Sequence, residues 1–134
     1  MPDQSGLSEA VLYVCTTCRA SGDASTRTAG ARLLTALRDQ AADMAPELRV
    51  EGIPCLSVCK RPCTVAVASP GRWTYVYGDL DADASAATIL AGIGLYAGTE
   101  DGIVPWRERP EAFRKGVVAR IPPLASAQPD TDAS

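Results

Sequence analysis

"CTVAVASPGRWTYVYGDL", residues 63–80, contains the clearest structural signal in the chain. Two segments with alternating apolar side chains, roughly 63–68 and 73–78, lie on either side of a Ser-Pro-Gly-Arg tetrapeptide. Alternation with a period of two is typical of strands, and a proline-glycine pair is typical of a turn. This stretch therefore predicts a β-hairpin.

Upstream of the hairpin, the sequence alternates between strand and helix patterns. Residues 10–15 form an apolar run rich in β-branched side chains, which predicts a buried strand ending at Cys15. Apolar side chains then recur at helical spacing over 26–44, and a second short strand is expected over 47–54. Two strands joined by a helix are expected to be parallel, with a right-handed crossover.

Both predicted helices have an apolar stripe and polar residues that can cap the N-terminus. The first stripe contains Ala29, Leu33, Leu34, Leu37, Ala41 and Met44, and the second contains Ala87, Leu90, Ile93 and Leu95. The second helix follows the hairpin and ends near Gly98. We expect Asp23 or Ser25 to cap the first helix and Asp81 or Asp83 to cap the second, because short polar side chains accept the N–H groups of a first turn.

The rest of the chain completes the expected fold. A short helix is expected at 110–115, and an extended segment at 116–121 that lies over the core. The predicted order is β-α-β-β-β-α with a mixed sheet and an extended C-terminal tail, which is a thioredoxin-like α/β arrangement. We expect one domain over 10–122, with flexible termini at 1–9 and 125–134.

Composition narrows the classes of function. The chain has 134 residues and a formal charge of -3, so it offers no basic surface for nucleic acid. The first ten residues are polar and unlike a signal peptide, and no apolar run is long enough to cross a membrane. We therefore expect a cytoplasmic protein. Histidine is absent from the sequence, which removes imidazole from any catalytic or metal-binding set.

The five cysteines form two groups, and the predicted topology brings these groups together. Cys15 and Cys18 follow the first strand, Cys55 and Cys59 follow the second, and Cys63 precedes the hairpin. Parallel strands end at the same edge of a sheet, where α/β folds commonly bind ligands. Four converging thiolates can hold either a tetrahedral zinc ion or a [2Fe-2S] cluster.

Other interpretations of the cysteines remain open at this point. They could be buried structural thiols, since cysteine is among the most buried residue types. They could also form a dithiol-disulfide oxidoreductase, since C-x-x-C after a first strand is typical of redox motifs. Such a motif normally opens a helix that lowers the thiol pKa, whereas a loop separates Cys18 from the predicted helix here. A structural zinc-binding interaction module is the third alternative.

The segment that begins at Cys55 also shows a family resemblance. The block CLSVCKRPCTVAVASPGRWTYVYGDL resembles the second half of the thioredoxin-like [2Fe-2S] ferredoxins, which implies that Cys55 and Cys59 are cluster ligands. That family separates its first two ligands by about a dozen residues, whereas Cys15 and Cys18 are three apart, so Cys63 is an alternative fourth ligand. With VCTTCR near its start and RIPP near its end, the chain is also similar to an uncharacterised bacterial family of predicted metal-binding proteins.

The sequence thus predicts a small ferredoxin-like metal-binding protein without catalytic residues. Cys15, Cys18, Cys55 and Cys59 are the expected ligands of a [2Fe-2S] cluster, with zinc as the alternative. The resemblance implies one-electron transfer, or cluster and metal handling, for a redox or metal-metabolism partner protein. It is also compatible with a homodimer.

Overall fold

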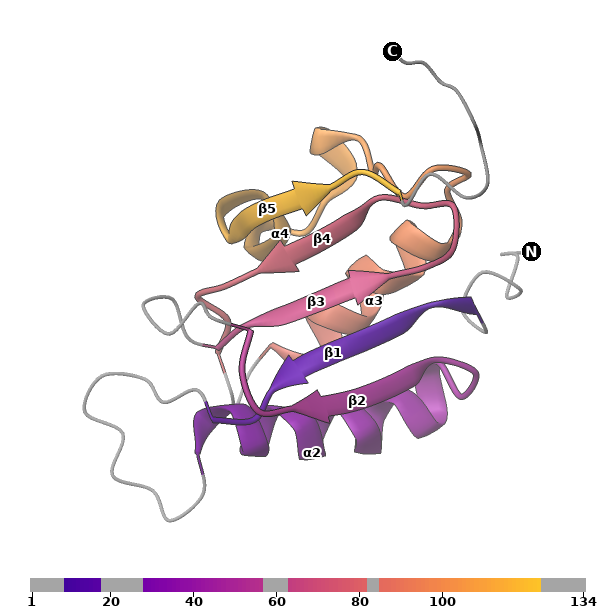
Figure 1. Ribbon diagram of the computed structural model, residues 1–134. Coiled ribbons are helices and arrows are strands. Elements are labelled where there is room, and N and C mark those ends of the chain that lie inside the picture. The colour runs from indigo at the N-terminus through magenta and orange to yellow at the C-terminus, as the bar shows by residue number, and fades with distance from the viewer. Residues whose placement is uncertain (1–8, 18–27, 57–62, 82–84, 124–134) are drawn as a thin grey trace.

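The computed structural model describes residues 9–17, 28–56, 63–81 and 85–123 (Figure 1). The strands are β1 (Val11–Cys15), β2 (Arg49–Ile53), β3 (Val65–Ala68), β4 (Thr74–Tyr77) and β5 (Val117–Ile121). The helices are α2 (Ala29–Met44), α3 (Ala86–Ala97), the 3-10 turn η1 (Trp106–Glu108) and α4 (Glu111–Lys115). The expected α/β class with a mixed sheet is confirmed.

The five strands form one mixed sheet in the order β2-β1-β3-β4-β5. β1 and β2 are parallel, as the helix between them predicts, with Val14 opposite Gly52 and Cys15 opposite Ile53. β3 lies antiparallel to β1, on the side away from β2, and pairs with β4. Parallel pairing places the carboxyl ends of β1 and β2 at the same edge of the sheet (Figure 1).

The hairpin between β3 and β4 has the predicted turn. The amide of Arg72 donates to the carbonyl of Ser69 at 3.1 Å, and Gly71 has a φ of 75°. Proline followed by a glycine at positive φ is the arrangement of a type II turn, because a side chain at the third position would be strained.

The C-terminal segment differs from the expectation. Residues 117–121 do not lie as a tail over the core but form β5, which pairs antiparallel with β4 through Tyr75 opposite Arg120. α4 at Glu111–Lys115 matches the short helix expected at 110–115. The sheet therefore has a fifth strand that the sequence pattern does not predict as a strand.

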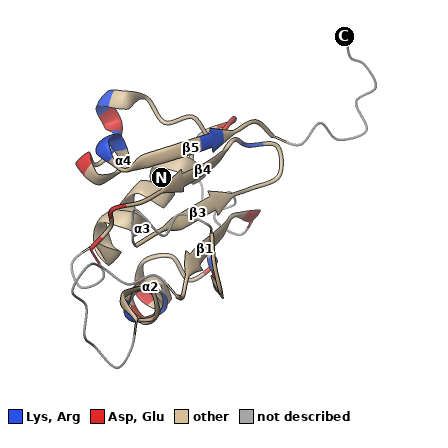
Figure 2. Cartoon of the chain, turned by 60° about the vertical axis from the view of Figure 1, so that its left-hand side comes forward, with Lys and Arg blue, Asp and Glu red and all other residues tan. Residues whose placement is uncertain are grey.

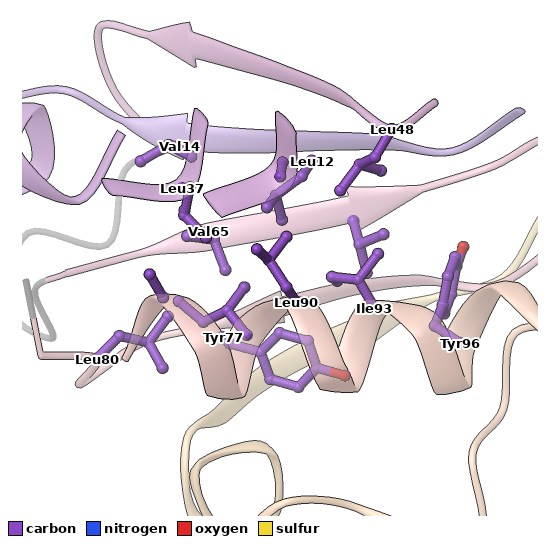
Figure 3. Close-up of a cluster of buried hydrophobic side chains, with 14 of the residues drawn as sticks. Leu12, Val14, Leu37, Leu48, Val65, Tyr77, Leu80, Leu90, Ile93 and Tyr96 are labelled. Atoms are coloured by element: carbon purple, nitrogen blue, oxygen red, sulfur yellow. The ribbon is translucent and has the colours of Figure 1, made fainter. Parts of the chain in front are cut away.

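The core lies between the sheet and the two longer helices. Leu12 and Val14 of β1 are fully buried and stand opposite Val67 and Val65 of β3, so alternate residues of the strands line a single face. α2 and α3 cover this face side by side (Figure 2). Leu37 of α2 and the buried side of α3 meet the strand side chains in one cluster (Figure 3).

Helix α2 begins three residues later than expected. Thr28 is its N-cap, since the amide of Ala31 donates to the Thr28 hydroxyl at 3.0 Å. Asp23 and Ser25, the predicted caps, therefore do not cap it, and they lie outside the described residues. The predicted stripe is buried except for Met44, which is exposed, and Leu34, which is half-buried.

Helix α3 also begins later than expected, with Ser85 rather than Asp81 at its N-cap position. Asp83, the other predicted cap, lies outside the described residues. The amide of Ser85 instead donates to the Asp81 carbonyl, and the Ser85 hydroxyl accepts from the Asp81 amide. Leu90 and Ile93 are buried as predicted, whereas Ala87 and Leu95 are exposed. The observed buried positions, which include Ala86, Ile89, Tyr96 and Ala97, follow the true helical period more closely than the predicted stripe.

In the described part of the chain, no helix combines the length and the apolar character that crossing a membrane would require.

Candidate metal centre

Cys15 is the last residue of β1 and is held by hydrogen bonds on both sides. Its amide donates to the carbonyl of Thr64 at 3.1 Å, just before β3. On the other side, the amide of Thr16 donates to the carbonyl of Ile53 at 2.8 Å, at the end of β2. The Cys15 side chain is 1% exposed. These contacts fix Cys15 between the segment that leads to Cys55 and the segment that follows Cys63.

The segment before Cys55 contacts the Cys15 sulfur directly. Cys15 Sγ lies 3.8 Å from the carbonyl oxygen of Pro54, to which it donates. The hydroxyl of Thr17 donates to the same oxygen and lies 3.7 Å from Cys15 Sγ. Pro54 is followed at once by Cys55, whose side chain is exposed. The ends of β1 and β2 therefore bring the Cys15 and Cys55 segments together.

Cys63 is part of the same edge but belongs to the core. Its amide donates to the carbonyl of Leu80 at 3.1 Å, and the amide of Leu80 donates back at 3.2 Å. This pair joins the segments before β3 and after β4 near the cysteine edge. The Cys63 side chain is 2% exposed and packs in the hydrophobic cluster. Cys63 is therefore as buried as Cys15 and lies at the same edge of the sheet.

The first turn of α2 closes this edge from a third side. The hydroxyl of Thr28 donates to the carbonyl of Thr16. A Cβ on Gly30 would lie 1.9 Å from the carbonyl oxygen of Cys15, so only glycine allows this approach. A helix N-terminus carries a partial positive charge, which favours negative charge nearby. The first turn of α2 thus lies against the backbone of Cys15.

The type of donor present fits a soft-metal centre. Thiolate sulfur is the usual ligand of zinc and of iron-sulfur clusters, and the chain has no histidine to compete with it. Cys18 and Cys59, the other two predicted ligands, lie outside the described residues. Among the residues that are described, no three Cys, Asp or Glu side chains stand in a metal-binding group. A four-sulfur site at this edge would therefore need at least one of Cys18 and Cys59 beside the described cysteines.

A hollow at the opposite end of β1 is separate from this edge. It has a volume of about 500 Å³ and is lined by the start of β1 and by the β3–β4 turn. Glu9 and Arg72 face each other in it at 3.6 Å. None of its lining residues is a cysteine, so it does not extend the cysteine site.

Sequence reasoning identified the cysteines but missed Thr17 and Pro54, which connect them. A threonine pair inside the C-x-x-C motif was visible, at Thr16 and Thr17. Its meaning depends on β2 lying beside β1, because both hydroxyls donate to carbonyls at the end of β2, at Ile53 and Pro54.

Comparison with solved structures supports the fold. The thioredoxin-like [2Fe-2S] ferredoxin from Aquifex aeolicus matches with a TM-score of 0.52 at 14% identity, over 83% of this chain and 91% of that chain. A cysteine-to-serine variant of that ferredoxin, solved at 1.05 Å resolution, matches with a TM-score of 0.51 at 12% identity, over 82% of this chain and 98% of that chain. At these identities the likeness establishes a shared thioredoxin-like fold.

Family membership follows from the sequence itself. No curated protein matches the chain. The model of one family matches residues 12–123, which include all of the cysteines and every strand except the first residue of β1. The chain therefore belongs to the family described as "Protein of unknown function (DUF1636)".

Proposed function

We propose that this protein is a small [2Fe-2S] protein that carries one electron, or handles a cluster or metal, for a partner enzyme. The observation that supports the proposal most directly is the contact of the Cys15 sulfur with the Pro54 carbonyl, which joins the two cysteine segments at one edge. In this proposal, Cys15 and Cys18 hold one iron, and Cys55 and Cys59 hold the other.

The chain's own residues would give such a centre a buried side and an open side. Cys15 is buried under the sheet edge, which excludes water from one sulfur, whereas Cys55 is exposed. When bound, a [2Fe-2S] cluster supplies reversible one-electron chemistry at a potential set by hydrogen bonds to sulfur and by solvent access. A redox partner would approach from the Cys55 side, since Cys55 is the exposed cysteine of the described edge.

An absorption spectrum of anaerobically purified protein tests the proposal. We expect bands between roughly 400 and 600 nm that bleach on reduction with dithionite, as sulfur-to-iron charge transfer requires. A colourless protein that holds one equivalent of zinc would instead identify a structural zinc module. A metal-free protein with an exchangeable disulfide between Cys15 and Cys18 would identify a dithiol oxidoreductase.

Single serine variants then test the ligands. Cys15→Ser, Cys18→Ser, Cys55→Ser and Cys59→Ser should each weaken or abolish the colour. Cys63→Ser serves as the comparison, because Cys63 packs in the core. The folded fraction of this variant should keep the colour, even if the substitution lowers its stability. If Cys63→Ser loses the colour while Cys18→Ser keeps it, Cys63 replaces Cys18 as the fourth ligand.

A further inference from the structure

Thr17, Cys15 and Pro54 form a triangle of polar atoms that links the two cysteine segments. The Thr17 hydroxyl donates to the Pro54 carbonyl, and the Cys15 thiol lies 3.8 Å from that same oxygen. The third side of the triangle, from Cys15 Sγ to Thr17 Oγ1, is 3.7 Å. Thr17 and Pro54 are exposed while Cys15 is buried. One carbonyl oxygen thus receives two donors from the neighbouring strand.

We propose that Thr17 is a positioning residue of the metal centre, which acts through Cys15 and through the segment before Cys55. This inference rests on the proposed function. Without metal, the Thr17 hydroxyl holds the end of β2 against the end of β1. With metal bound, the same hydroxyl would rotate about its C–O bond and donate to the Cys15 sulfur.

The reason for this change of hydrogen-bond partner is the loss of the Cys15 proton when metal binds. A cysteine binds metal as the thiolate, so the Cys15 proton passes to solvent when the sulfur forms its metal bond. The sulfur then has no proton to donate to Pro54 and can accept from the Thr17 hydroxyl, whose oxygen lies 3.7 Å away. Because Pro54 is exposed, water can replace the hydroxyl on its carbonyl at little cost.

Two measurable effects follow from such a hydrogen bond. Groups that orient a metal ligand typically change metal affinity about 10- to 100-fold when they are removed. A hydrogen bond to a ligand sulfur also stabilises the more negative, reduced state of an iron-sulfur cluster, which raises its reduction potential. Removing the hydroxyl should therefore lower both the metal affinity and the potential.

The chain offers a matched control in the residue next door. The Thr16 hydroxyl donates to the Ile53 carbonyl at 3.1 Å, so it too joins β1 to β2, but among the described residues it contacts no sulfur. Thr17→Val and Thr16→Val each remove one hydroxyl–carbonyl bond between the same two strands. Only Thr17→Val also removes the donor beside Cys15, and Thr17→Ser keeps it.

The experiment compares wild type and these three variants by two measurements. Competition with a chromophoric chelator gives the affinity for Co²⁺, whose absorption reports thiolate ligation. Spectroelectrochemical titration gives the midpoint potential of the anaerobically reconstituted cluster. We expect Thr17→Val to bind Co²⁺ about 10- to 100-fold more weakly and to have a more negative potential. Thr17→Ser should restore both values, and Thr16→Val should leave the potential unchanged.

The outcomes separate this inference from the proposed function. If wild type binds Co²⁺ and the cluster but Thr17→Val has the wild-type affinity and potential, the role of Thr17 is refuted and the proposed function stands. If Thr16→Val shifts the potential as much as Thr17→Val does, the effect is structural and the role of Thr17 is again refuted. If wild type takes up neither the cluster nor Co²⁺, the proposed function fails and the role of Thr17 fails with it.

Discussion

Gly30 decides how closely α2 can approach the cysteine edge. It is the second residue of the helix, and its α-carbon faces the backbone of Cys15. Any side chain there would overlap the Cys15 carbonyl, which is fixed in turn by the pairing of β1 with β2. The start of α2 can therefore contact the end of β1 only because Gly30 has no Cβ atom.

We expect Gly30→Ala to destabilise the protein by about 1–3 kcal/mol, because overpacking a fixed backbone forces the helix to shift. The added Cβ would lie 1.9 Å from the Cys15 oxygen. Gly94→Ala is the matched control, since a Cβ there meets nothing within 4 Å in the same kind of helix. That control should gain about 0.5–1 kcal/mol from helix propensity. Urea unfolding curves measure both, and equal effects of the two substitutions would contradict the prediction.

Tyr96 carries a buried hydroxyl that should respond to alkaline pH. Its OH donates to the carbonyl of Trp73 at 2.6 Å. Burial raises the pKa of Tyr96 from 10.0 to about 12, although the positive charge of Arg72 acts to lower this pKa. Between pH 10 and 12 the unfolded chain releases a proton that the folded chain keeps, so the free energy of unfolding falls as pH rises through this window.

Tyr96→Phe removes both the hydrogen bond and this pH dependence. At pH 8 we expect the variant to be about 1–2 kcal/mol less stable, because the Trp73 carbonyl loses a donor. Between pH 10 and pH 11 its stability should decline less steeply than that of wild type. Some decline remains because burial also raises the pKa of Tyr77. Parallel slopes for the two proteins in urea titrations over this range would contradict the assignment.

At the scale of elements, Arg72 fastens the hairpin turn to the end of α3. Its guanidinium donates to the Ala97 and Thr99 carbonyls at 3.3 and 2.9 Å, and to the Ser69 hydroxyl at 2.8 Å. The side chain is 14% exposed. Carbonyls at the C-terminus of a helix carry partial negative charge, so a cation there is favourable. A single side chain thus joins the turn after β3 to the last turn of α3.

We expect Arg72→Ala to cost about 2–3 kcal/mol, because it removes charge-assisted hydrogen bonds and leaves buried acceptors without a donor. Arg49→Ala is the control. Arg49 pairs with Glu51 on the surface, with both side chains exposed, and such pairs contribute about 0–1 kcal/mol. Thermal unfolding followed by circular dichroism distinguishes the two. Equal unfolding temperatures for Arg72→Ala and Arg49→Ala would show that the hydrogen bonds of Arg72 do not stabilise the fold.

Arg38 has a related role at the edge of the sheet. From α2 it donates to the carbonyl of Val50 at 3.2 Å. β2 is the outermost strand on this side of the sheet, and unpaired groups on such strands can pair with other chains. A helix side chain that occupies an edge carbonyl protects the strand against this pairing.

At the scale of the whole molecule, β5 forms the outer strand of the sheet beside β4. β5 pairs with β4, and Val117 packs against the core cluster. The sequence predicted a domain over 10–122 with flexible ends, and those boundaries stay a prediction. We expect a chain that ends at Leu124 to unfold at the wild-type temperature. A chain that ends at Gly116 should unfold about 10 °C lower or more, because it loses one strand of five. Equal midpoints for the two truncations would contradict this boundary.

Local patterns were sufficient for most elements of this fold. The hairpin, α2, α3 and the parallel pairing of β1 with β2 follow from periodicity and connection rules, and the structure confirms them. The caps at Thr28 and Ser85 were missed because several polar residues precede each helix and only packing selects among them. β5 was missed because its pairing with β4 joins segments separated by about forty residues.

The sequence by itself determined the chemistry of the candidate site. Five cysteines and no histidine restrict any metal ligand set largely to sulfur, whatever the fold. The tertiary structure decided which groups surround the cysteines. Cys15 contacts Pro54, Thr17 and the first turn of α2, and Cys63 is buried in the core. The physical reason is that residue types follow from composition alone, whereas these contacts depend on strand register and helix approach. Both are set only when the core packs.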